Sequence, residues 1–276
     1  MVVTGSSTGI GRACALHLDR LEFTVFAGVR KEADAEAISA AGSERLEPLI
    51  LDVTDPDQIG AAAEQVAEKS PAGLAGLVNN AGAAVAGPLE LIPIDDFRRQ
   101  IEVNLIGQVA VTQAFLPALR RARGRVVFLS SIGGLVANPY MSPYHASKFG
   151  IEAVGDSLRQ ELRRFGVRVS IVEPGSVATP IWEKGRGTAE SIRDGFTPEE
   201  DELYGEKVAR MGEVATEVGA RGVPPEKVAE VIAHALTANR PKTRYLVGTD
   251  AKAMVLIRRL LPDRVTDRLV ARVTGL

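Results

Sequence analysis

The stretch Val2-Val3-Thr4-Gly5-Ser6-Ser7-Thr8-Gly9-Ile10-Gly11 places three glycines between a short apolar run and a helix-like segment. Glycine at such a turn accepts positive φ and lets backbone N–H groups approach an anion, and the following helix adds partial positive charge. The pattern indicates a phosphate cradle for a dinucleotide, although its spacing differs from the common G-x-G-x-x-G. A purely structural turn is the alternative. The cradle candidates are Gly5, Ser7, Thr8, Gly9, Ile10 and Gly11.

Short apolar runs alternate with helix-like segments along the chain. Continuous runs of this kind suit strands buried on both faces, and their alternation with helices predicts an α/β fold with a doubly wound parallel sheet. The predicted strands cover residues 2–3, 23–29, 46–51, 74–78, 125–129, 167–172 and 244–247. The predicted helices cover 9–20, 34–41, 55–69, 95–121, 143–165 and 225–238. No repeat or long linker divides residues 1–276, so we expect a single domain.

Composition excludes several functional classes. The chain is 45% hydrophobic with a net charge of −2, so nothing indicates nucleic-acid binding. Cys14 is the only cysteine, which excludes an internal disulfide and predicts a reducing, cytoplasmic location. The sequence contains no apolar run of about eighteen residues, so no membrane-spanning helix is predicted. The three histidines are scattered, and no metal site is predicted.

Two segments depart from the alternating pattern. Residues 180–223 are rich in glycine and charge and predict either a substrate-binding loop inserted in the domain or a pair of surface helices. Residues 251–276 form an amphipathic tail with apolar residues at helical spacing and an excess of basic residues. Such a tail can pack on its own protein, cover a cleft or subunit, or lie on a membrane surface. We favour packing on the protein, because Pro262 divides the tail.

The end of the second predicted strand bears on cofactor choice. An acidic residue here would bind the ribose 2′-hydroxyl of NAD, but the sequence reads Gly28-Val29-Arg30-Lys31. Arg30 is suited to pairing with the 2′-phosphate of NADP. We therefore expect NADP rather than NAD, and the alternative is that both cations are solvated. Asp52, after the third strand, is a candidate contact for the adenine amino group.

Tyr144 and Lys148 stand four residues apart in a predicted helix, which places them on one face. A free tyrosine has a pKa of about 10, and a nearby ammonium favours its phenolate. Such a tyrosine can act as an acid or base in hydride transfer between a nicotinamide cofactor and an alcohol or carbonyl. Ser131 follows the fifth predicted strand, where its hydroxyl can polarise a carbonyl.

These motifs together resemble those of the short-chain dehydrogenase/reductase family. The matching positions span nearly the whole chain and are Thr4-Gly5, Gly9, Gly11, Asp52, Asn79-Asn80-Ala81-Gly82, Asn104, Ser131, Tyr144, Lys148, Pro174-Gly175 and Thr179. The resemblance implies a Rossmann-type fold. It also implies a small-molecule alcohol or carbonyl as substrate, and a homodimer or homotetramer formed through the helices around 95–121 and 143–165. Residues 147–152 and the strand end Gly28-Val29-Arg30 look similar to those of retinol and hydroxysteroid dehydrogenases. A hydrophobic substrate is indicated by the loop, the apolar tail and the flanking residues Leu135, Val136, Met141 and Trp182.

The resemblance also assigns roles to single residues. Tyr144 is implied to be the acid and base, and Ser131 to bind the substrate oxygen. Lys148 is implied to hold the nicotinamide ribose and lower the Tyr144 pKa, and Asn104 to kink its helix and hold a water. The implied remaining cofactor contacts are Asp52, Val53, Asn80, Ala81, Gly82, Pro174, Gly175, Val177 and Thr179. An epimerase or dehydratase of the extended group and a non-catalytic NADP sensor are the rival functions.

Overall fold

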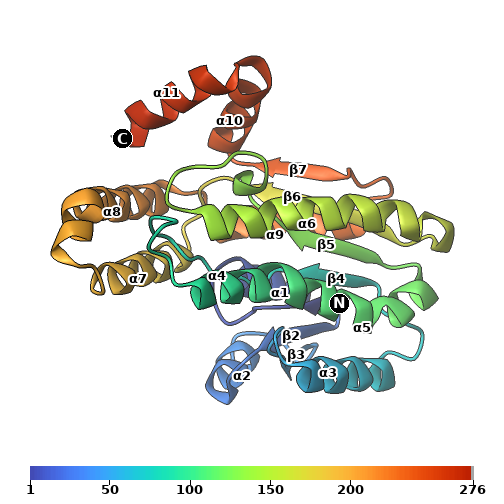
Figure 1. Cartoon of the computed structure of the whole chain (residues 1–276). Coiled ribbons are helices and arrows are strands. Elements are labelled where there is room, and N and C mark those ends of the chain that lie inside the picture. Colours follow the sequence, from blue (N-terminus) through green and yellow to red (C-terminus); the bar gives the residue numbers. More distant parts are fainter. Residues whose placement is uncertain (275–276) are drawn as a thin grey trace.

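A computed structural model describes residues 1–274, whose strands form one parallel sheet (Figure 1). The strand order is β3-β2-β1-β4-β5-β6-β7. The strands are β1 (Val2–Val3), β2 (Val25–Val29), β3 (Leu46–Ile50), β4 (Gly76–Asn79), β5 (Arg125–Leu129), β6 (Arg168–Pro174) and β7 (Arg244–Val247). All seven predicted strands are confirmed, and so is the doubly wound parallel arrangement.

Helices cover both faces of the sheet. One face packs against α1 (Gly9–Arg20), α2 (Glu32–Ser39) and α9 (Pro225–Thr237), and the other against α3 (Pro56–Lys69), α5 (Gly107–Ala122) and α6 (Ser142–Glu161). Alternate strand residues enter opposite cores, as a pleated strand requires. Val126 and Phe128 of β5 join one core, and Val127 and Leu129 join the other. The continuous apolar runs of the sequence follow from this two-sided burial.

The helix predicted over 95–121 consists of three pieces. α4 (Ile94–Ile101) is followed by a π-helical turn, η1 (Glu102–Ile106), and then by α5. Asn104 lies in the middle of η1 and is fully buried. π turns of this kind interrupt a helix most often at functional sites. The interruption that the family resemblance implied at Asn104 is therefore present.

The segment 180–223 is a pair of helices, not an irregular loop. α7 (Ile181–Arg193) and α8 (Pro198–Arg221) lie side by side at one end of the molecule (Figure 1). Thr197 and Glu200 form a reciprocal capping box that begins α8. The Tyr204 hydroxyl of α8 donates to Glu90 Oε2 at 2.5 Å, which ties the pair to the loop after β4.

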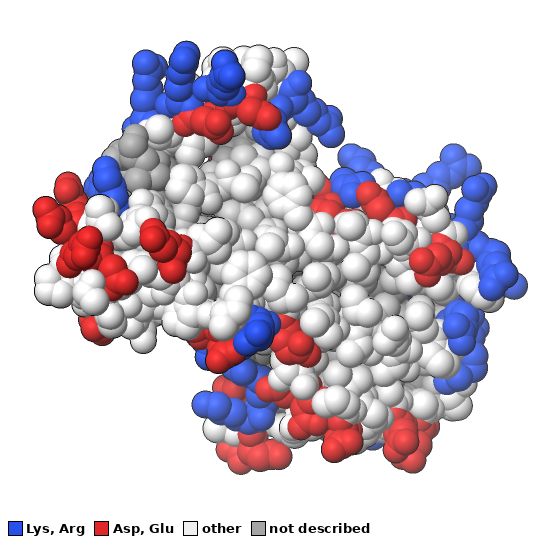
Figure 2. Space-filling view, viewed as in Figure 1, with Lys and Arg blue, Asp and Glu red and all other residues white. Residues whose placement is uncertain are grey.

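The C-terminal tail forms a helical hairpin. α10 (Thr249–Leu260) contacts β7, and α11 (Asp263–Thr274) contacts α8 and α10, with Pro262 between them. On the outward face of this hairpin, Leu256 is 58% exposed and Leu260 is 70% exposed. Lys and Arg side chains gather over it at the top of Figure 2. Within residues 1–274, no helix is long and apolar enough to cross a membrane. Residues 275–276 of the predicted tail lie outside the described residues.

Candidate active site

The glycine turn after β1 has the backbone that a phosphate cradle requires. Gly5 and Gly9 have φ of +67° and +56°, a region that residues with a Cβ rarely adopt. Gly11 contacts the turn itself, because a Cβ on Gly11 would lie 2.2 Å from the Gly5 carbonyl oxygen. The three glycines therefore satisfy separate requirements, two of conformation and one of close approach.

The turn is fixed to the end of β4 by the Thr4 hydroxyl, a motif position to which the sequence analysis gave no role of its own. Thr4 Oγ1 accepts hydrogen bonds from the backbone N–H groups of Asn80, at 2.9 Å, and Ala81, at 3.0 Å. In return, Asn80 Nδ2 donates to the Thr4 carbonyl at 2.8 Å. A polar residue at the end of a fully buried strand was the available signal for Thr4. β1 and β4 are neighbours where the strand order reverses, which is where doubly wound sheets bind ligands.

The amino end of α1 fits a pyrophosphate. Thr8 occupies the N-cap position without a side-chain capping bond, and no acidic residue lies in the first turn. The N–H groups of that turn and the positive end of the helix dipole thus lack a side-chain acceptor. Thr179 lies beside the turn, 3.2 Å from where a Cβ of Gly9 would be. This brings Thr179 to the cradle, 170 residues from Gly9 along the chain.

The ends of β2 and β3 form the other limit of the predicted cofactor site. Arg30 Nη1 lies 3.9 Å from Asp52 Oδ2, and the Arg30 side chain is 68% exposed. Asp52 Oδ1 accepts from the Thr54 N–H at 2.9 Å. A hollow of about 390 Å³ adjoins them and is lined by Arg30, Asp52, Thr54, Arg98, Arg99, Glu102 and Val103. The arginines of α4 at this hollow were not predicted. Val53 is buried beneath the site.

The loop after β6 is held by two later helices. Asp250 Oδ2, at the start of α10, accepts from the Ser176 N–H at 2.7 Å, beside Gly175. Val177 is buried, and its carbonyl accepts from Trp182 Nε1 of α7 at 2.7 Å. Trp182 therefore has a structural role in holding this loop. The loop that carries the predicted nicotinamide contacts is thus fixed from both sides.

Ser131, Tyr144 and Lys148 meet at the carboxyl end of β5. Tyr144 lies in the first turn of α6, and its hydroxyl is near enough to Ser131 for Ser131 to lower the pKa of the phenol. The Ser131 hydroxyl also accepts from the Gly133 N–H at 3.0 Å, which orients it. Lys148 is buried, and its Nζ lies 5.8 Å from the centre of the Tyr144 ring and donates to the Leu129 carbonyl at 2.8 Å. The three predicted catalytic side chains are therefore adjacent.

The protonation of this group differs from the expectation. Burial raises the pKa of Tyr144 above its ordinary value, and the nearby Ser131 hydroxyl offsets only part of the rise. Burial also lowers the pKa of Lys148 to about 8, against the attraction of Glu152. The lowered phenol pKa that sequence analysis expected from Lys148 is thus absent in this state, because loss of water outweighs the nearby cation. The phenol is therefore protonated at neutral pH.

Asn104 connects the catalytic helix to the end of β4. Its Oδ1 accepts from the Ala83 N–H at 2.8 Å, and its Nδ2 donates to Ser147 Oγ at 3.2 Å. Ser147 Oγ in turn donates to the Tyr144 carbonyl at 2.7 Å. Asn104 thereby positions the first turn of α6, which carries Tyr144, relative to the loop that carries Ala81 and Gly82.

His145 shapes the loop opposite Tyr144. Its Nε2 accepts from the Asn138 N–H at 2.9 Å, so Nδ1 carries the proton and donates to the Gly133 carbonyl at 2.8 Å. Burial lowers the pKa of His145, which keeps the ring neutral. The sequence gave it no catalytic role, and the structure explains its presence by these backbone contacts.

Other proteins are similar to this chain in sequence and in fold. The family model for short chain dehydrogenases matches residues 1–189. The chain belongs to the short-chain dehydrogenase family. It is 41% identical to retinol dehydrogenase 5 of Mus musculus over 276 residues, covering 97% of this chain and 86% of that protein.

Two further proteins extend the comparison. The NADPH-dependent 3-dehydrocapnine reductase of Ornithobacterium rhinotracheale is 35% identical over 274 residues, covering 97% of this chain and 94% of that protein. The crystal structure of a short-chain dehydrogenase from Streptomyces avermitilis superposes with a TM-score of 0.79 at 30% identity, covering 97% and 93% of the two chains. This short-chain dehydrogenase is therefore an NAD(P)-dependent enzyme acting on CH–OH groups.

Proposed function

We propose that the enzyme uses NADP to interconvert a secondary alcohol and a carbonyl on a hydrophobic small molecule, with Tyr144 as acid and base. The observation that carries the proposal is the proximity of the Tyr144 and Ser131 hydroxyls beside the buried Lys148 amine. A half-buried phenol next to a second hydroxyl can share a substrate oxygen with it. Both lie at the carboxyl edge of the sheet, where doubly wound folds bind ligands.

The bound nicotinamide would supply or accept the hydride. In carbonyl reduction, Tyr144 gives its hydroxyl proton to the substrate oxygen while Ser131 holds that oxygen by a hydrogen bond. In alcohol oxidation, the same two residues act in reverse, and Tyr144 takes the proton. Because burial raises the pKa of Tyr144, the phenol retains its proton at neutral pH and can act as the acid in reduction.

Arg30 supports NADP as the cofactor. Its guanidinium is exposed at the end of β2, and no carboxylate occupies the position that binds the ribose of NAD. A charge-assisted pair between arginine and phosphate would favour NADP. Asp52, 3.9 Å from Arg30, neutralises part of that charge and reduces the preference. The reductase from Ornithobacterium, named as NADPH-dependent, is consistent with this choice.

The residues near Tyr144 support an apolar substrate. Leu135 and Met141 flank η2 (Ile132–Gly134) and the start of α6, and both are partly exposed. Ile192 of α7 packs with Val85 and Ile92 of the loop after β4 in a small apolar cluster. The relative from Mus musculus is named retinol dehydrogenase 5, and retinol is an apolar alcohol.

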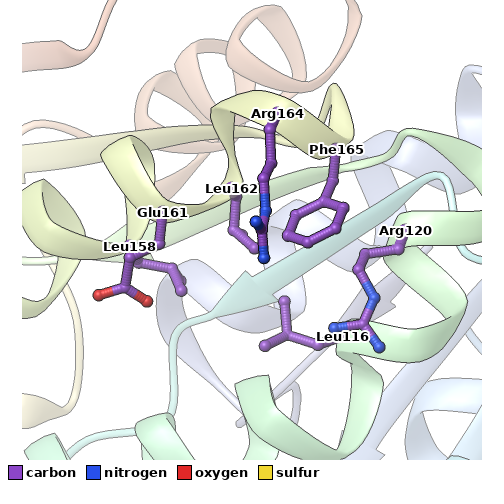
Figure 3. Close-up of a pocket in the computed structure, with 7 residues that line it drawn as sticks. All are labelled: Leu116, Arg120, Leu158, Glu161, Leu162, Arg164 and Phe165. Atoms are coloured by element: carbon purple, nitrogen blue, oxygen red, sulfur yellow. The ribbon is translucent and has the colours of Figure 1, made fainter.

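We further propose a homodimer or homotetramer formed through α5 and α6. A hollow of about 560 Å³ separates the carboxyl-terminal parts of these helices, and no predicted catalytic residue lines it (Figure 3). Its lining residues are Leu116, Arg120, Leu158, Glu161, Leu162, Arg164 and Phe165. Its mixed apolar and charged lining is typical of subunit contacts. A cytoplasmic location stays a prediction from the single cysteine.

Cofactor absorbance at 340 nm tests the proposed function. NADPH and NADH oxidation would be followed separately over a panel of hydrophobic ketones and aldehydes. We expect turnover with NADPH preferred. Preference for NADH would leave the Tyr144 chemistry intact and make Arg30 a solvated charge. Cofactor binding without turnover on the whole panel would contradict the assigned substrate class.

A further inference from the structure

Four ionisable side chains lie at every fourth position of α6. They are Tyr144, Lys148, Glu152 and Asp156, and this spacing places them along one face of the helix. The first two belong to the proposed catalytic group, and the last two have no part in it so far. Glu152 is only 6% exposed, although glutamate is almost never buried without a partner.

Arg244 of β7 is the partner that holds Glu152. Its Nη2 lies 3.0 Å from Glu152 Oε2 and 2.7 Å from Asp156 Oδ2. Its Nε lies 3.1 Å from Glu173 Oε1, on β6. We call these four residues the Arg244 cluster. The cluster contains three carboxyl groups and one guanidinium, so it holds more potential negative than positive charge.

The charge of Glu152 depends on Arg244, because burial raises the pKa of the Glu152 carboxyl whereas the hydrogen bonds and charge of Arg244 lower it. Arg159 lies 3.0 Å from Asp156 and balances it at the surface. Burial and the charge of Glu152 raise the pKa of Glu173 to about 7, so Glu173 is partly neutral, and Arg259 of α10 acts on it as well. The charged groups nearest Glu152 are therefore Arg244 and Asp156, and Lys148 lies one helical turn away.

The 3₁₀ turn η2 closes over Lys148 and Glu152. A Cβ on Gly134 of this turn would lie 2.9 Å from the Lys148 carbonyl oxygen and 3.1 Å from Glu152 Cγ. Ser130, which precedes the turn, is also buried, and its Oγ would lie 2.7 Å from a Cβ on Gly134. Backbone packed this closely leaves little room for water between the turn and the helix. Charges in such a place interact more strongly than charges at the surface.

We propose that Glu152, held by Arg244, is a positioning residue that keeps the Lys148 ammonium charged inside the protein and so preserves the cation beside Tyr144. This inference rests on the proposed roles of Tyr144 and Lys148. Burial alone disfavours a charged lysine, and Glu152 is the group whose attraction opposes that effect. Asn104 and Ser131 orient the catalytic side chains, whereas Glu152 sets the charge of one of them.

The test measures the titration of Lys148 with and without the carboxylate. Protein labelled with ¹³C at lysine Cε would be titrated by NMR, with the Lys148 signal assigned from the Lys148→Arg spectrum. Glu152→Gln removes the charge and keeps the shape. We expect the Lys148 midpoint to fall by about one pH unit in this variant. Because the measurement needs no substrate, it is independent of whether the proposed function is right.

Asp156→Asn is the matched control. It also removes a contact with Arg244, but it lies two turns from Lys148 and is 40% exposed. We expect the Lys148 midpoint of this variant to stay at the wild-type value. An equal shift in both variants, or no shift in Glu152→Gln, would overturn the proposal.

Enzyme activity gives a second readout. In carbonyl reduction, Tyr144 and Lys148 must both be protonated, so the loss of rate at high pH reports the shared titration of the pair. Glu152→Gln is expected to move this limb to lower pH, and Asp156→Asn to leave it in place. If Glu152→Gln does not fold, Glu152→Asp replaces it in both the NMR titration and the pH profile. Its side chain is one methylene shorter, so the carboxylate lies in a different place. A smaller shift in the same direction is expected, and an unchanged midpoint overturns the proposal.

Discussion

Gly11 and Gly5 are in direct backbone contact across the glycine turn. A Cβ on Gly11 would lie 2.2 Å from the Gly5 carbonyl oxygen and 2.3 Å from Asn80 Nδ2. Neither group can withdraw easily, because Gly5 is held by the turn and Asn80 Nδ2 donates to the Thr4 and Gly5 carbonyls. The cradle is thus assembled from three segments in contact.

Gly11→Ala is expected to disrupt this contact. The methyl group would force the turn away from α1, with a cost of about 1–3 kcal/mol in the free energy of unfolding and a loss of NADPH affinity. Urea unfolding and calorimetric titration with NADPH measure the two effects. Gly60→Ala is the control, because a Cβ at Gly60 in α3 has no neighbour within 4 Å. We expect it to stabilise the protein by about 0.5–1 kcal/mol. Equal behaviour of the two variants would contradict this account.

Tyr144→Phe removes the hydroxyl and keeps the ring. Proton transfer by a positioned side chain contributes about 10²–10⁴-fold, so we expect kcat to fall by that factor while the thermal midpoint stays near the wild-type value. The assay is NADPH absorbance with the best ketone of the panel. A variant that turned over at the wild-type rate would exclude Tyr144 as the acid and base.

Arg30→Ala tests cofactor choice. If Arg30 pairs with the 2′-phosphate, kcat/KM for NADPH should fall by about tenfold or more, because charge-assisted bonds contribute about 1.5–3 kcal/mol. The value for NADH should change little. Arg98→Ala is a control at the same hollow, since Arg98 already pairs with Asp95 at 2.8 Å. Equal losses with both cofactors in Arg30→Ala would show that Arg30 does not read the phosphate.

Asp19 gives a prediction on stability and pH. Burial raises its pKa, but hydrogen bonds from Ser43 and the charges of Arg45 and Arg20 outweigh burial, so the net pKa is lowered. An acid with a lowered folded-state pKa stabilises the protein above its unfolded pKa of about 3.9, and the contribution is lost as pH falls through the folded value.

Asp19→Asn should therefore reduce the free energy of unfolding by about 1–3 kcal/mol at pH 7. The difference from wild type should stay constant down to about pH 5 and narrow below pH 4. Urea unfolding at several pH values measures it. A difference that did not change with pH would mean that the Asp19 charge contributes nothing beyond its hydrogen bonds.

Association in solution tests the proposed subunit contact. We expect light scattering to show a dimer or tetramer, and Leu116→Asp to shift it toward monomer, because Leu116 lines the hollow between α5 and α6. Leu203→Asp, at an exposed residue of α8, is the control and should leave the mass unchanged. A monomeric wild type would refute the contact.

The sequence alone determined the strands, the glycine turn and the positions of Ser131, Tyr144 and Lys148. These depend on local rules: continuous apolar runs for two-sided burial, glycine where φ is positive, and four-residue spacing on a helix. The same rules left residues 180–223 ambiguous, because their glycines and charged residues obscure the helical pattern. The Thr197 capping box and packing against the loop after β4 stabilise these helices in the structure.

Only the tertiary structure decided which distant residues act together. Arg244 meets Glu152 across 92 positions, and Asp250 meets Ser176 across 74. It also decided that burial raises the pKa of Tyr144, whereas the sequence suggested that Lys148 lowers it. Contacts between side chains far apart in sequence depend on how the sheet closes, and desolvation depends on everything that surrounds a group. Neither can be read from local spacing, so the positions of Ser131, Tyr144 and Lys148 could be predicted but the raised pKa of Tyr144 could not.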